Sequence, residues 1–235
     1  MVGGITMTAK LALIHTVGSL VPVFADLTRE LAPDVEVTNV VDEALLGETI
    51  AAGRIPDATA ERLERHVDDA FADGADLVMV TCSSVGPAVE AIAERRNVAL
   101  LRVDEALADR AIELGSRIGV IATLSTTLEP TADLIRRRAA ARGRAAGSVE
   151  IVTHLCEGAF DALKAGRLDE HDTLVRAGLR ELLPRVDVVV LAQASMARVA
   201  ATLTDADTLG RPILASPRLG VERAISRLVT AADRS

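Results

Sequence analysis

The sequence predicts an α/β protein of two pseudosymmetric halves, each a parallel sheet covered by helices, with the functional site in the cleft between them. Short runs rich in Val and Leu alternate with stretches whose apolar residues recur at helical spacing. The pattern also repeats, since residues 10–16 match residues 117–123 in character and residues 76–84 match residues 187–195. Because both matches occur in the same order, they indicate a duplicated unit.

The first half contains four predicted strands. Apolar, β-branched runs place them at residues 10–16, 35–41, 77–80 and 99–103. Between the strands, helical spacing and the Gly and Pro residues that end or begin helices predict helices at residues 20–31, 57–72, 85–96 and 106–114, with a short helix within residues 42–55.

The second half repeats this alternation. We expect strands at residues 117–123 and 149–155 and a third that starts at Asp187, with helices at residues 127–141, 157–165 and 169–183. The tail reads as a strand at residues 212–216 and a helix at residues 217–231, with Pro217 in its first turn. Because the tail follows the second half, we expect it to return to the first. The predicted domains are residues 1–104 with 208–235, and residues 105–207.

Cys82 lies where a buried strand ends and the next helix begins. Ser83 and Ser84 follow as N-cap candidates, and Pro87 is tolerated in a first helical turn. Ligands of open α/β sheets bind outside the carboxyl ends of strands. A helix N-terminus favours a thiolate, so we expect Cys82 to be accessible with a depressed pKa. The alternative is a cysteine that serves only as a small buried hydrophobe.

The predicted strand ends are rich in hydroxyl groups and poor in charge. Hydroxyls and helix N-terminal N–H groups are suited to holding a small carboxylate, although helix capping would explain each hydroxyl alone. His15 has a pKa range suited to proton transfer, but strand alternation could equally turn it into the core. The candidate binding residues are His15, Thr16, Thr81, Ser83, Ser84, Thr123, Ser125, Thr126, Ala194 and Ser195.

Composition excludes several classes of partner. A net charge of −8, with no Trp or Tyr, argues against a nucleic-acid partner. No apolar run approaches a membrane span, and residues 1–10 contain no apolar leader, so we expect neither a membrane association nor a signal peptide. Two cysteines fit a reducing cytoplasm better than a disulfide framework. The histidines show no metal-ligand spacing, so no metal site is expected.

The Thr81-Cys82-Ser83-Ser84 turn, the repeated halves and the chain length together resemble the aspartate/glutamate racemase superfamily. That group also includes hydantoin racemases, maleate isomerase and arylmalonate decarboxylase, and the resemblance covers roughly residues 8–231. It implies two α/β halves that clamp a small carboxylate or hydantoin-like substrate between two cysteines. One thiolate would remove a proton and the other thiol would deliver one on the opposite face. The resemblance further implies no cofactor and a homo-oligomer, expected to be a dimer.

Cys82 matches the first cysteine of that pattern, whereas the repeat places Gln193 at the second. An amide can only form hydrogen bonds, so a reaction with two thiol bases is not expected. Three chemistries stay open: isomerisation or racemisation with Cys82 as acid/base or nucleophile, decarboxylation or lysis with Cys82 protonating an enediolate, and acyl chemistry. A noncatalytic carboxylate-binding protein is a further alternative. Cys156 aligns with neither site, and we expect it to be structural.

Overall fold

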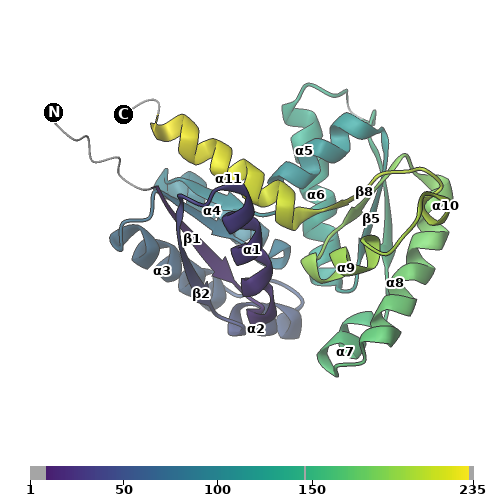
Figure 1. Cartoon of the computed structure of the whole chain (residues 1–235), viewed down its shortest axis with the longest axis horizontal. Coiled ribbons are helices and arrows are strands. Elements are labelled where there is room, and N and C mark those ends of the chain that lie inside the picture. Colours follow the sequence, from purple (N-terminus) through teal and green to yellow (C-terminus); the bar gives the residue numbers. More distant parts are fainter. Residues whose placement is uncertain (1–8, 146, 233–235) are drawn as a thin grey trace.

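The computed structural model describes residues 9–145 and 147–232, which form two four-stranded parallel sheets (Figure 1). The expectation of no leader in residues 1–10 falls mostly on residues outside this part. In the first sheet the strand order is β2-β1-β3-β4, and in the second it is β6-β5-β7-β8. The strands are β1 Lys10–His15, β2 Glu36–Val41, β3 Leu77–Val80, β4 Leu100–Arg102, β5 Arg117–Ala122, β6 Glu150–Leu155, β7 Val188–Leu191 and β8 Ile213–Ala215.

Helices connect the strands and cover the sheets. In the first half they are α1 Val21–Leu31, α2 Ala44–Ala52, α3 Asp57–Ala72 and α4 Gly86–Arg96. The remaining α-helices are α5 Glu105–Leu114, α6 Ser125–Ala141, α7 Ala159–Lys164, α8 Leu168–Leu182, α9 Ala197–Ala200, α10 Asp205–Thr208 and α11 Ser216–Ala232. Short 3₁₀ turns, η1 Gly18–Leu20, η2 Ser83–Val85, η3 Leu183–Arg185 and η4 Ala194–Met196, precede or follow several of them. Within the described residues, none of these helices combines the length and apolarity needed to cross a bilayer.

The two sheets share one pairing register, which confirms the predicted α/β architecture of duplicated halves. Leu11 pairs with Leu77 in the first sheet, and the equivalent Ile118 pairs with Val188 in the second. The likeness extends to a polar contact at the start of each central strand. Asp76 accepts the Lys10 backbone N–H at 2.8 Å, and Asp187 accepts the Arg117 backbone N–H at 2.8 Å. The duplication therefore fixes both strand pairing and strand starting points.

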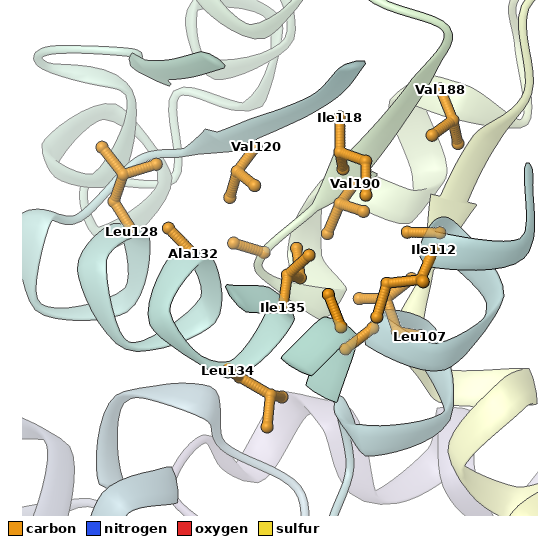
Figure 2. Close-up of a cluster of buried hydrophobic side chains, with 14 of the residues drawn as sticks. Leu107, Ile112, Ile118, Val120, Leu128, Ala132, Leu134, Ile135, Val188 and Val190 are labelled. Atoms are coloured by element: carbon orange, nitrogen blue, oxygen red, sulfur yellow. The ribbon is translucent and has the colours of Figure 1, made fainter. Parts of the chain in front are cut away.

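Two helices cross the junction between the halves, and each packs on the sheet of the half opposite to the strand before it. Helix α5 follows β4 but packs on the second sheet, where Leu107 and Ile112 join Ile118, Val120 and Leu134 in one buried cluster (Figure 2). This core is aliphatic, as the near absence of aromatic residues requires.

Helix α11 crosses in the opposite direction and lies over the first half (Figure 1). Its residues Val221, Ala224 and Leu228 are buried with residues of β1 and β3. Arg223 of α11 donates to Glu105 and Asp109 of α5 at 3.0 and 2.9 Å, which joins the two crossing helices.

The last strand does not follow the predicted domain boundary at residue 208. β8 pairs with β7 in the second sheet, and only α11 returns to the first half. The sequence order alone could not show this, because a strand and the helix after it can cover different sheets. Helices α9 and α10 were also not predicted. A capping box marks α10, in which Asp207 accepts the Thr204 backbone N–H at 2.9 Å.

Candidate active site

Cys82 and Gln193 begin equivalent turns in the two halves. Cys82 follows β3 and precedes η2, with φ −130° and ψ 119°. Gln193 follows β7 and precedes η4, with φ −131° and ψ 137°. Because the backbone has the same form at both positions, the two halves differ there chiefly in chemistry. One carries an ionisable thiol, and the other an amide that cannot transfer a proton.

A threonine at the end of each central strand contacts its half's turn residue. The Thr16 hydroxyl is hydrogen-bonded to the Cys82 sulfur. In the second half, Gln193 Oε1 accepts the backbone N–H of Thr123 at 2.5 Å and its hydroxyl at 2.9 Å. Thr16 and Cys82, and likewise Thr123 and Gln193, thus lie together at the carboxyl end of their own sheet.

The pKa of the Cys82 thiol is higher than the sequence analysis predicted. Burial raises its pKa, and this outweighs hydrogen bonds from the Thr16 hydroxyl and the backbone N–H groups of Ser84 and Val85, which favour the thiolate. The expected depressed pKa is therefore wrong. The reason is that the side chain, although partly exposed, packs against the apolar core beneath the turn. The thiol is accordingly protonated near neutral pH.

His15 lies in the interior of the first half. Its Nε2 donates to Asn39 Oδ1 at 2.9 Å, and its Nδ1 accepts the Thr81 hydroxyl at 2.9 Å. Burial lowers the pKa of the ring more than the Asn39 hydrogen bond raises it, so the ring is neutral near neutral pH. His15 and Thr81, two of the predicted substrate-binding residues, use these polar atoms within the protein. The structure places neither of them in the wall of the cavity described next.

A cavity of about 440 Å³ lies between the halves. Its size is in the range of small-molecule sites. The loop after α2, the start of α4 and the first turns of α6 enclose it. The residues that line it are Thr49, Gly53, Arg54, Ile55, Ser84, Pro87, Ser125, Thr126, Glu129 and Pro130.

Three of the predicted binding residues, Ser84, Ser125 and Thr126, line this cavity. Thr126 Oγ1 is buried and has no hydrogen-bond partner within the described residues. Ser84 Oγ instead lies 2.7 Å from Thr127 Oγ1, a contact that joins the first half to α6. The other predicted residues that the structure describes are not among those lining this cavity; they are His15, Thr16, Thr81, Cys82, Ser83, Thr123, Gln193, Ala194 and Ser195.

The sequence analysis predicted a cleft with few charges and did not identify Arg54 and Glu129, two charged residues that line the cavity. Within the described residues, neither side chain forms an ion pair or hydrogen bond. They come from different halves, so only the tertiary structure brings them to one cavity. A partial signal was present in the Gly53-Arg54 turn, since a cation exposed beside a glycine at the sheet's carboxyl end suits anion binding.

Cys156 is structural in character. It is buried within the core of the second half, and burial raises its pKa to about 12. In the described part of the chain, no group of three or more His, Cys, Asp or Glu side chains is arranged to hold a metal ion.

The sequence profile of the Asp/Glu/Hydantoin racemase family matches residues 13–224. No curated protein sequence shows significant similarity to the chain. Among solved structures, glutamate racemase RacE1 from Bacillus anthracis aligns with a TM-score of 0.68 at 14% identity, covering 95% of this chain and 82% of that one. The aspartate racemase of Picrophilus torridus aligns with a TM-score of 0.68 at 12% identity, covering 94% of each. Allantoin racemase from Klebsiella pneumoniae aligns with a TM-score of 0.63 at 16% identity, covering 95% and 89%.

Alkylation with iodoacetamide measures the state of the Cys82 thiol. Because its pKa is raised above 9.0, we expect slower labelling at pH 7 than for free cysteine, and a rate that still rises above pH 9.0. Peptide mass spectrometry of the folded protein assigns the label, with the buried Cys156 as an internal control that stays unlabelled. A labelling midpoint below pH 8 would contradict the raised pKa.

The buried His15 makes folding stability depend on pH. Its folded pKa lies below the ordinary 6.5, so the unfolded chain binds more protons between the two values. This contribution to the free energy of unfolding is fully present above pH 6.5 and decreases as pH falls through the folded pKa. We expect His15→Gln to flatten that slope by up to ~1.4 kcal/mol per pH unit. Urea unfolding of both proteins between pH 5 and 7.5 checks this, and equal slopes would refute it.

Proposed function

Because the chain belongs to the Asp/Glu/hydantoin racemase family, an isomerase family, we propose that it acts on a small carboxylic or hydantoin-like substrate without a cofactor. Cys82 transfers the proton at the carbon next to the carboxylate or carbonyl. The observation that carries this proposal is the equivalence of the Cys82 and Gln193 turns. Because only one of these two positions carries an ionisable group, this equivalence supports a reaction that uses a single thiol.

The cavity supports this reading with groups that suit an anion. Arg54 is a cation without a partner in the described residues, and Thr126 lines the same cavity. The cavity also contains the first turn of α6, whose N–H groups and helix dipole attract a carboxylate. Hydrogen bonds of this kind stabilise the enediolate that forms when the neighbouring carbon loses a substituent or a proton. Ser84, in the same wall, is two residues from Cys82.

The protonated thiol makes Cys82 a proton donor at neutral pH. In this form Cys82 can protonate the enediolate left by decarboxylation or lysis. In isomerisation its thiolate first removes the proton from carbon, and the thiol so formed returns a proton to the enediolate. Gln193 hydrogen-bonds the reacting acid without exchanging a proton. Family membership favours isomerisation, and a single-cysteine decarboxylase or lyase is the alternative that the lone thiol favours.

A noncatalytic carboxylate-binding protein is the second candidate. The substitution of an amide at the second turn, together with the raised Cys82 pKa, favours a clamp that has lost proton transfer. We also infer a cytoplasmic location, which suits the free Cys82 and Cys156, and a homodimer, on the family resemblance.

Solvent deuterium exchange tests the proposed reaction. The protein is incubated in D₂O with glutamate, aspartate, allantoin, and hydroxy, aryl and dicarboxylic acids, and NMR follows deuterium at the carbon next to the carboxylate or carbonyl, as well as any product. We expect exchange or product with at least one compound, and a loss of ~10²-fold or more in Cys82→Ser. Cys156→Ser is the matched control and keeps full activity.

Two results would reject this assignment. Undiminished turnover in Cys82→Ser would remove the thiol from the mechanism. Binding detected by thermal shift, without exchange or product from any compound, would select the noncatalytic candidate.

Arg54 is expected to bind the substrate's negative charge. Arg54→Gln removes a charge-assisted hydrogen bond, so KM should increase ~10- to 100-fold with a smaller change in kcat. Steady-state kinetics on the substrate found by exchange measure both constants. Arg29→Gln, which alters an exposed pair with Asp26 on α1, is the control. An unchanged KM in Arg54→Gln would show that the carboxylate binds elsewhere.

A further inference from the structure

A buried ion pair lies behind the Cys82 turn. Arg102, 3% exposed at the end of β4, donates from Nε and Nη2 to the two carboxylate oxygens of Asp104 at 2.7 and 2.8 Å. Asp104 is 0% exposed. Burial opposes the charge on each group, but their mutual attraction outweighs it, so the pKa of Asp104 is held low and that of Arg102 high. Both groups are therefore charged in the interior.

The pair contacts the turn at both of its ends. The Ser83 hydroxyl, directly after Cys82, is hydrogen-bonded to the Asp104 carboxylate. At the other end of η2, the Arg102 guanidinium lies against Gly86, where a Cβ atom would overlap it. The Ser83 hydroxyl, predicted to bind substrate, therefore contacts the buried pair in this structure. The three residues of η2 are held between Asp104 and Arg102.

The second half forms the same turn without an ion pair. The strand registers equate Ser83 and Gly86 with Ala194 and Ala197, and Arg102 and Asp104 with Ala215 and Pro217. The backbone angles at Cys82 and Gln193 are nevertheless closely similar. The fold therefore does not need these charges to make the turn, and they accompany the thiol alone.

A buried ion pair is a poor source of stability, since desolvating two charges offsets much of their attraction. We propose that Arg102 and Asp104 are positioning residues that hold the η2 turn so that its N–H groups and Cys82 keep a fixed geometry. This inference deepens the proposed function, because it concerns the thiol to which that function assigns proton transfer.

The outer side of the pair reaches the second half. Arg102 Nη1 donates to Glu90 Oε2 at 2.9 Å, and the same carboxylate accepts Arg137 of α6 at 2.8 and 3.1 Å. Helix α6 also supplies Ser125, Thr126 and Glu129 to the cavity wall. A continuous set of charge-assisted bonds therefore links the helix that lines the cavity to the turn that begins with Cys82.

The test is the pH profile of Cys82 alkylation by iodoacetamide in Ser83→Ala, a change that copies the Ala194 of the other turn. We expect the midpoint to rise by about half to one pH unit, because the Ser84 and Val85 N–H groups are then aimed less well at the sulfur. All ionisable groups of the region stay in this variant, namely His15, Arg54, Glu90, Arg102, Asp104, Glu129 and Arg137. A shift would therefore report geometry rather than lost charge.

Three further variants make the outcome specific. Ser83→Thr keeps the hydroxyl and should retain the wild-type midpoint. Asp104→Asn breaks the same link but also leaves the positive charge of Arg102 unpaired, which favours the thiolate, so its midpoint should rise less than that of Ser83→Ala. Asp76→Asn alters the opposite end of β3 and should lower the melting temperature without moving the midpoint.

An unchanged or lowered midpoint in folded Ser83→Ala would overturn the proposal, as would an equal shift in Asp76→Asn. Alkylation needs no turnover, so the two proposals fail separately. A raised midpoint in a protein that catalyses no exchange would support the positioning role and reject the enzymatic one. If the wild-type protein catalyses deuterium exchange but Ser83→Ala leaves the pH profile of Cys82 alkylation unchanged, the enzymatic role is supported and the positioning role is rejected.

Discussion

The pairing register of the parallel strands is the constraint on which the rest of this structure depends. In each half, an aspartate holds the backbone at the start of the central strand, and the strands then run side by side to a common edge. Because side chains and chain ends advance together in parallel strands, this register brings Thr16 to Cys82 and Thr123 to Gln193. A slip of one residue would move the side chains of a strand to the opposite face of its sheet and separate both pairs.

Much of the fold could be predicted because its signals are local. The Val-rich strand Leu77–Val80 was placed at its observed bounds, and the duplicated segments led directly to the equivalence of Cys82 and Gln193. The prediction that β8 belongs to the first half was wrong, because the sequence of a three-residue strand does not indicate which sheet it joins. Of the predicted binding residues, Ser84, Ser125 and Thr126 line the cavity between the halves.

The errors at the site have a common physical cause. The burial of His15 depends on which face of β1 is covered by α1 and on the neighbouring Asn39 of β2. The raised pKa of Cys82 depends on the apolar core beneath its turn. Arg54 and Glu129 come from loops and helices of different halves, so only the packing of the halves brings them to one cavity. Each of these properties is set by long-range contacts, which local sequence patterns do not encode.

The exchange of α5 and α11 between the halves has a consequence for how the chain is made. The first sheet is synthesised early, yet its core includes Val221, Ala224 and Leu228 near the other end of the chain. While the ribosome is still adding residues, the apolar face that α11 covers stays open on the nascent polypeptide. The first half can close only after nearly all of the second has emerged, so the two halves reach their native form together and not in order of translation.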